Sequence, residues 1–417
     1  MNDYRFPENR ITKALLALYL FVMLYLCRDS MFCLSVVGFY PSMAVTLGAT
    51  ALVGLAFLWH QRGNLKAVFL DGRMKVALAV TVLVLAPMVL KRDWQFMYVS
   101  ILICMYTAIL LSYFISCQAL AKYYVGMMTA LGVYSILAAY LFRVPIDMGL
   151  VEKDVFRNAS NVGFYNFLFS VVPRTYAKSR NFGLFREPGV YQYFILLALF
   201  LTHYGVQWKK QRTMWVVTAI LSVVMISTLA TGGLAELALL AAFVFFDKKL
   251  YRNKILLVVV LLILIALPGF LYYNYDYYTP LWYQIEVNIV GKFTRPGDSL
   301  FERTESLAVN LEILKEHPLV GDRLANVLHV VENNTSSSLI LFAAFGVLSG
   351  AFHVLAWGAL VWKKERNVLG NLLLLVILFL SFNTQNLIGD QFFWLFPVMA
   401  LTEKSVPYLK GRRKETA

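Results

Sequence analysis

Charged residues are scarce in this chain of 417 residues, because Asp, Glu, Lys and Arg together make up only 15% of it. Soluble domains carry about 25%. With 59% hydrophobic residues, this scarcity excludes an ordinary soluble domain. Cysteine is also rare, and three of the four cysteines fall inside apolar runs while the fourth lies near the edge of one. A disulfide framework and a thiolate metal site are therefore both disfavoured.

Several other patterns are missing. The five histidines show no metal-ligand spacing and there is no Asp-x-Asp pair, so we expect neither a metal nor a cofactor. No repeat relates the two halves of the chain, although such repeats are typical of transporters. No small-residue cleavage site follows the first apolar run, which predicts a retained helix and not a removed signal peptide.

What the chain does have is apolar stretches of about twenty residues, each long enough to cross ~30 Å of hydrocarbon. They predict one all-α integral membrane domain, residues 1–417, with about 12 transmembrane helices. The run from 214 to 246 is divided into a hairpin because basic segments flank it on both sides. The predicted helices lie near 12–27, 36–59, 74–90, 95–117, 121–142, 189–206, 214–230, 232–246, 255–272, 338–361, 368–384 and 389–402.

The net charge of +14 predicts the orientation of these helices. With both termini in the cytoplasm, the cytoplasmic segments hold 23 Lys and Arg against 7 Asp and Glu, while the outward segments hold 15 against 16. Positive charge that gathers on the inner side follows the positive-inside rule and matches anionic headgroups. We therefore expect membrane lipids as partners and no nucleic acid.

Two outward loops, residues 143–188 and 273–337, are too long to be simple connectors, and loops of this length usually carry function. The second contains a predicted amphipathic helix near 299–316. Ser299 and Glu302 have the spacing of a capping box, and four leucines fall on one face. The polar side of this helix includes Arg303, Ser306 and Asn310.

The segment RNFGLFREPGVYQ, residues 180–192, places fixed charge directly before an apolar run. Glu187 followed by Pro188 predicts a helix start, since Pro is favoured at the first helical position. The free N–H groups of such a start attract anions, and Arg180 and Arg186 can each hold a phosphate with two hydrogen bonds. The structural alternative is that Arg186 pairs with Glu187 while Arg180 reaches lipid phosphates.

The pattern R-x-x-G-x-F-x-E-P, formed by Arg180, Gly183, Phe185, Glu187 and Pro188, resembles the signature of bacterial O-antigen and capsular polysaccharide polymerases (Wzy-type). That family shares a superfamily with the O-antigen ligases. A second resemblance follows in order: an arginine and amphipathic helix, then HPLVG, then ENNTSSS and a helix that opens LILFAAFGVLSG. The predicted architecture of many helices with two large periplasmic loops also resembles that of this superfamily. It is a GT-C-like glycosyltransferase architecture.

The resemblance implies a multi-pass protein of the bacterial inner membrane that performs a metal-independent glycosyl transfer at the periplasmic face. A growing glycan leaves undecaprenyl pyrophosphate and joins the next lipid-linked repeat unit, and a chain-length regulator is a further candidate partner. Ligases carry a histidine just before the Asn of the last motif, where this sequence has Thr335 or Asn334, which favours a polymerase. A ligase and, from another class, a flippase of the same lipid-linked oligosaccharide remain the alternatives.

The resemblance also assigns roles. Arg180 and Arg303 are expected to hold the pyrophosphates of the two substrates. The candidate bases for the acceptor hydroxyl are Glu187, His317 and Glu332 in that order, although nearby arginines and a helix start make Glu187 a weak base. The residues expected to bind substrate are Arg186, Gly183, Tyr191, Glu332 and Asn334.

Two further features carry structural expectations. Glu236 lies inside a predicted helix, where a charged group is costly, so it is expected to face the bundle interior and a partner. Gly346 and Gly350 stand four residues apart, a spacing that permits close packing between helices.

Overall fold

The computed structural model describes residues 10–37, 39–61, 71–150, 155–157, 163–174, 180–254, 258, 262, 299–331 and 334–405. These residues hold fourteen α-helices and one small sheet, so the protein is all-α in class. Four stretches are long and apolar enough to cross a membrane. They are α4 (Gly72–Leu90), α5 (Phe96–Phe114), the continuous stretch Cys117–Asp147 and α16 (Ser337–Val361).

Eleven of the twelve apolar helices predicted from the sequence are helices in the structure. The twelfth, near 255–272, falls outside the described residues except at two positions. The other elements are α1 (Arg10–Tyr25), η1 (Phe32–Val37), α2 (Phe39–Gln61), α6 (Cys117–Ile136), η2 (Leu137–Phe142), α7 (Val144–Asp147), β1 (Val155–Arg157), β2 (Gly163–Asn166), β3 (Val171–Pro173), α8 (Pro188–Tyr204), α9 (Gln211–Ser227), α10 (Thr231–Asp247), η3 (Leu250–Arg252), α14 (Ser299–Glu316), α15 (Leu324–His329), α17 (Val368–Phe382) and α18 (Gln391–Ser405).

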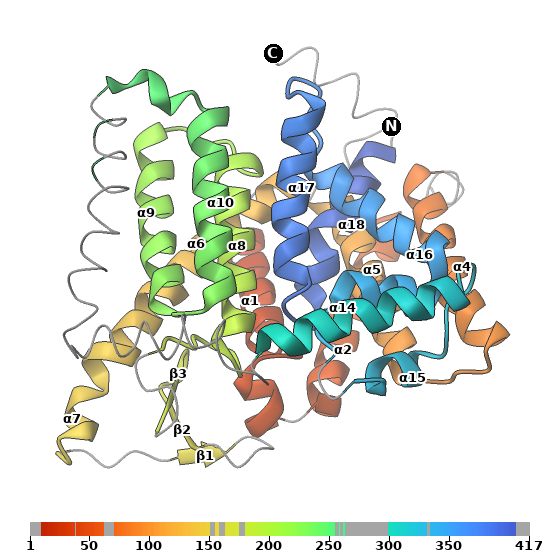
Figure 1. The fold of residues 1–417 in the computed structure, drawn as a ribbon, viewed down its shortest axis with the longest axis horizontal. Helices are drawn as coiled ribbons and strands as arrows, with labels where there is room; N and C mark the ends of the chain where they lie inside the picture. Colours follow the sequence, from red (N-terminus) through yellow and green to blue (C-terminus); the bar gives the residue numbers. More distant parts are fainter. Residues whose placement is uncertain are drawn as a thin grey trace.

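The helices α8 and α18 form the centre of the bundle (Figure 1). Every residue of α8 from Val190 to its end is buried, because a helix that is apolar on all sides must be covered on all sides. The helices α6, α9, α10 and α17 pack around it, and α18 has α4, α5, α6 and α16 as neighbours. The rings of Phe194 in α8 and Phe392 in α18 meet edge to face at 5.8 Å.

The outer faces of the bundle expose large apolar side chains. Leu52, Leu55, Leu78, Leu348 and Leu369 are between 62% and 69% exposed. Large exposed apolar surfaces mark sites of contact with a membrane or with other proteins. Together with the four long apolar helices, this surface indicates a multi-pass membrane protein.

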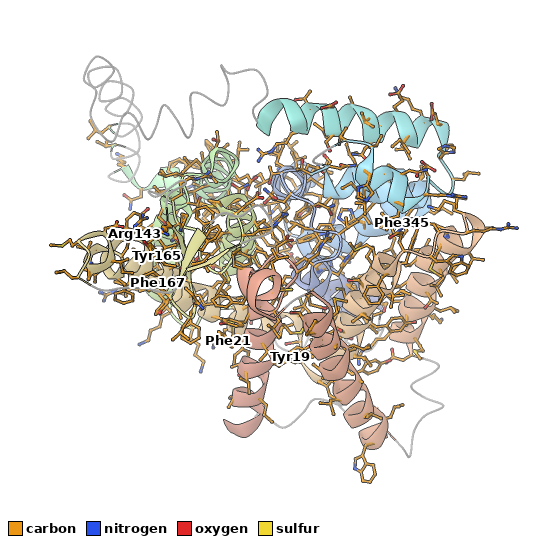
Figure 2. The ribbon with its side chains drawn as sticks, turned by 90° about the horizontal axis from the view of Figure 1, so that it is seen from below. Tyr19, Phe21, Arg143, Tyr165, Phe167 and Phe345 are labelled. Atoms are coloured by element: carbon orange, nitrogen blue, oxygen red, sulfur yellow. The ribbon has the colours of Figure 1, made fainter. Side chains whose placement is uncertain are left out.

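Part of the first long loop folds as an antiparallel sheet in the order β1-β2-β3. The sheet packs on η2 through a small core of its own, made by Ala138, Ala139, Phe167 and Val172. Arg143 is buried beside it, and its Nε donates to Asp147 Oδ2 at 2.8 Å. Figure 2 shows Arg143, Tyr165 and Phe167 gathered on one flank of the molecule, with Phe345 on the other.

The second long loop contains α14, which covers the residues predicted to form a helix and packs against α16. In Figure 1 it lies crosswise to α10 and α17. The segment after α14 joins α16 by backbone pairing, since Val347 N donates to Pro318 O and Asp322 N donates to Ala343 O, both at 2.8 Å. α16 is broken there at Gly346, where φ is 77° and ψ is 178°.

The break corrects the expectation for the two glycines of α16. A Cβ on Gly346 would overlap the carbonyl of Leu319, so this glycine admits the segment after α14 into the break and does not serve helix–helix packing. A Cβ on Gly350 would meet the ring of Phe342, which belongs to the same helix. Both glycines therefore shape the break itself.

We expect Gly346→Ala to lower the free energy of unfolding by about 1–3 kcal/mol, because this backbone conformation is nearly restricted to glycine. The measurement is thermal unfolding of the purified protein in detergent. Gly358→Ala is the matched control in the same helix, since a Cβ there meets nothing within 4 Å. Equal melting temperatures for the two variants would contradict the role of Gly346.

Candidate functional site

The start of α8 agrees with the sequence prediction. Glu187 is the N-cap in an extended conformation, with φ −144° and ψ 146°, and Pro188 is the first helical residue. The Glu187 side chain makes no capping hydrogen bond and is about half exposed. It therefore remains available to another group at the surface.

The segment before α8 pairs with the connection that follows α1. Met31 N donates to Leu184 O at 2.9 Å and Arg186 N donates to Asp29 O at 3.1 Å. The side chain of Arg186 faces the same residue, with Nε 2.9 Å from Asp29 Oδ1, whereas its Nη1 is 3.8 Å from Glu187 Oε1. Burial lowers the pKa of Arg186, but the carboxylates of Asp29 and Glu187 outweigh burial and raise it above its ordinary value.

Asp29 is the residue that sequence reasoning missed at this point. The structural alternative paired Arg186 with Glu187, but the nearer partner is Asp29, which is 4% exposed. A short connection after the first helix gave no reason to expect a contact with a segment 157 residues away. The only signal was an acidic residue at the end of an apolar run.

Gly183 and Tyr191 belong to the interior of this segment. Gly183 has φ +55°, and a Cβ on it would lie 2.6 Å from the Tyr191 ring. Tyr191 is 1% exposed, and its hydroxyl lies 3.2 Å from that of Ser135. In the structure they shape the loop, because the ring packs directly against a residue without a side chain, and their role in substrate binding stays a prediction.

Asn181, also missed from the sequence, holds the loop to two helices. Its Nδ2 donates to Ser135 Oγ at 2.8 Å and to Ser227 Oγ at 3.0 Å. Its Oδ1 accepts from Gly183 N at 3.0 Å. This fixed loop positions Arg180, the residue directly before Asn181.

Arg180 and Arg303 both reach the N-terminal end of α10. Arg180 Nε donates to Thr228 O, three residues before the helix, at 3.0 Å. Arg303, in the second turn of α14, lies within electrostatic reach of Glu236 in the second turn of α10. Glu236 is 2% exposed and also faces Ser381 of α17, so its expected position in the bundle interior is confirmed. Two arginines from separate loops thus approach residues 228–236.

Asn334 links α14 to the chain before α16. Its Oδ1 accepts from Ser306 Oγ at 2.7 Å and from Asn310 Nδ2 at 2.8 Å. Its Nδ2 donates to Asn310 Oδ1 at 3.2 Å and to Val327 O at 2.7 Å. An asparagine amide has two donors and two acceptor sites, so all are used. Asn334 therefore has a structural role, and its expected role in substrate binding stays a prediction.

Of the two remaining candidate bases, the structure places His317 away from Arg303. His317 follows α14 and is exposed. Fourteen residues separate it from Arg303, which at ~1.5 Å per residue is about 21 Å along the helix. His317 is therefore too far away to act on a group held by Arg303. Glu332 lies outside the described residues.

The end of α14 near His317 is anchored by the connection between α4 and α5. Lys91 Nζ donates to Asp322 O at 2.6 Å and also to Ala344 O. Asp93 Oδ2 accepts from Leu324 N, at the start of α15, at 2.6 Å. Burial lowers the pKa of Lys91 from 10.5 to about 8, although the charges of Asp93 and Asp322 oppose the shift.

The chain matches no protein-family model, no curated protein and no solved structure. No group of three or more His, Cys, Asp or Glu side chains that could hold a metal ion occurs among the described residues. What the described part of the chain offers chemically is two arginines, a buried carboxylate and a group of uncharged polar side chains at one end of α10.

We expect Asn334→Ala to destabilise the protein by about 1–3 kcal/mol, because it leaves buried partners on α14 without hydrogen bonds. Hydrogen exchange of α14 should also increase. Asn326→Ala is the control, since Asn326 is exposed on the neighbouring α15. Unchanged exchange of α14 in Asn334→Ala would contradict the proposed link.

The lowered pKa of Lys91 predicts that the stability of the protein depends on pH. The pKa of Lys91 is lower in the folded protein, so between about pH 8 and 10.5 the unfolded chain binds more protons. The contribution of this lysine to the free energy of unfolding should therefore rise with pH over that range. Melting temperatures of wild type and Lys91→Met, measured from about pH 7 to pH 10, should diverge as the pH rises. Lys75→Met, at an exposed position of α4, is the control, and parallel curves for wild type and Lys91→Met would refute the prediction.

Proposed function

We propose that the protein is a metal-independent glycosyltransferase that polymerises lipid-linked oligosaccharide repeat units at the outer face of the bacterial inner membrane. The observation that carries the proposal is the approach of Arg180 and Arg303, from two separate loops, to the N-terminal end of α10. The motif resemblance to Wzy-type polymerases supports it. About 12 spans, a GT-C-like architecture and cytoplasmic termini belong to the same proposal.

Arginine suits a pyrophosphate better than other side chains do. It stays charged at any physiological pH, and its planar fork of N–H groups fits two phosphate oxygens at once. The reaction needs the negative charge of the departing pyrophosphate to be stabilised as the bond breaks. Two arginines near one helix end can provide that stabilisation, one for the pyrophosphate of each substrate, while Arg186 is held by Asp29 and supports the loop.

The proposed transfer joins two lipid-linked glycans. A hydroxyl oxygen of one glycan attacks the anomeric carbon of the other, and undecaprenyl pyrophosphate leaves with the electron pair of the broken C–O bond. The hydroxyl proton passes to a base. Glu187 is the first candidate for this role, because its carboxylate is half exposed and caps no helix N–H group.

The other partners in the proposal follow from the membrane character of the chain. The carrier lipid would reach the site from the bilayer that the exposed leucines indicate. A separate chain-length regulator is a candidate protein partner.

We expect Arg180→Ala and Arg303→Ala each to abolish polymerisation while the protein still inserts in the membrane at normal levels. Arg180→Lys and Arg303→Lys should have little more activity than the alanine variants, because a lysine cannot form a two-point contact with phosphate. Arg323→Ala is the control, since this arginine is exposed in the connection between α14 and α15. Full activity of either of the first two alanine variants would remove that arginine from the proposal.

A deletion strain separates the competing functions. Loss of a polymerase leaves surface lipid that carries a single repeat unit, whereas loss of a ligase leaves bare lipid core. Loss of a flippase traps the lipid-linked units inside the cell. A normal ladder of glycan lengths on a gel would overturn the polymerase proposal.

A further inference from the structure

Four uncharged or acidic polar side chains meet where α8, α10 and α17 come together. Gln192 of α8 donates from Nε2 to Thr384 Oγ1 at 3.1 Å, and Thr384 Oγ1 donates to Ser381 O at 2.8 Å. Glu236 faces Ser381. A Cβ on Gly233 would lie 2.7 Å from Gln192 Oε1, and Gly233 shares a helix face with Glu236, three residues later. These side chains therefore form one cluster.

By distance and angle, four buried atoms of this cluster have no hydrogen-bond partner among the described residues: Gln192 Oε1, both carboxylate oxygens of Glu236, and Ser381 Oγ. Glu236 and Ser381 face each other, but a contact between them could satisfy only one carboxylate oxygen and leaves the other and Gln192 Oε1 open. Gln192, Glu236 and Ser381 are at most 2% exposed. Buried polar atoms in native proteins are almost always satisfied, and groups that are not point to an ion, a water or a ligand. Three adjacent side chains from three helices thus indicate a site at which another molecule supplies the missing hydrogen bonds.

The chemistry of the orphaned atoms defines what fits. The Gln192 oxygen can only accept hydrogen bonds, the Glu236 carboxyl accepts when ionised and can also donate when protonated, and Ser381 Oγ can accept or donate. A phosphate, which at neutral pH offers almost only acceptors, fits the arginines and not this cluster. A cation is disfavoured because Arg303 already places a positive charge beside Glu236. Neutral hydroxyl donors fit best.

We propose that Gln192, Glu236 and Ser381 form a subsite that binds the hydroxyl groups of a sugar residue, beside the arginine that holds its pyrophosphate. This inference rests on the proposed function, because the sugar arrives joined to the lipid pyrophosphate. Arg303 borders the subsite from α14, whose other end is anchored by Lys91 and Asp322. The phosphate and sugar parts of the ligand would thus be recognised by different groups.

The experiment compares two probes on purified full-length protein. One is undecaprenyl pyrophosphate, and the other is the same lipid with its oligosaccharide, extracted from cells that lack the gene. For wild type, the glycan should tighten binding by about tenfold or more. Glu236→Gln and Gln192→Leu should each remove most of this gain, while Glu312→Gln, on the exposed side of α14, should keep it.

The affinity for undecaprenyl pyrophosphate without its glycan distinguishes the possible outcomes. If Glu236 serves only to position Arg303, Glu236→Gln changes the affinity for bare lipid and leaves the gain from the glycan intact, which overturns the subsite. If ordered water satisfies the orphaned atoms, the glycan adds no affinity in wild type, which overturns it as well. If wild type binds neither lipid, the proposed function fails together with the subsite. Ser381→Ala, which removes one hydroxyl and adds no volume, gives the same comparison if a larger change prevents folding.

Discussion

The attachment of α14 to α16 is the constraint on which the candidate site depends. The face of α14 that packs on the bundle is polar, since Ser306 and Asn310 are buried while Leu307 and Leu311 are exposed, so the position of the helix comes from directed contacts. Backbone pairing at the Gly346 break and the two hydrogen bonds from Lys91 fix one end. The four hydrogen bonds of Asn334 fix the middle. Arg303 at the other end is placed as a consequence of both.

The loop before α8, which carries Arg180, is also held in place by directed contacts. It enters the interior through Gly183, which tolerates a left-handed backbone and leaves room for the Tyr191 ring. Asn181 supplies the hydrogen bonds that a buried loop needs, and Asp29 balances the charge of Arg186. A short loop, hydrogen-bonded to α6, α9 and β3, thus holds Arg180 although the loop has no regular structure of its own.

Much of the fold could be predicted from the sequence, because apolar runs of membrane length and Pro188 at a helix start are local signals. The helix at α14 was also predictable from its own periodicity. The contacts that assemble the site were not, since Asp29 with Arg186 and Asn334 with Ser306 pair residues distant in the chain. For the same reason the structural contacts of Tyr191 and Asn334 could not be predicted: their motifs are visible in the sequence, but the distant groups that bond to their polar atoms are not. The four-residue spacing of Gly346 and Gly350 is compatible both with close helix packing and with a break in the helix, so the sequence alone could not distinguish the two.

The sheet of the first long loop contacts the rest of the molecule in two places: Phe167 and Val172 form a small core with η2, while Phe164 and Val171 belong to the core of the bundle. Arg143 adds support, because it ties α7 to the strand ends through Asp147 and the carbonyl of Arg174. Val171 N also donates to Gly183 O at 2.7 Å, so the sheet is joined directly to the loop that carries Arg180. A change in the sequence of this outer sheet would therefore be transmitted to the arginine, and the rim of the molecule cannot diversify independently of its centre.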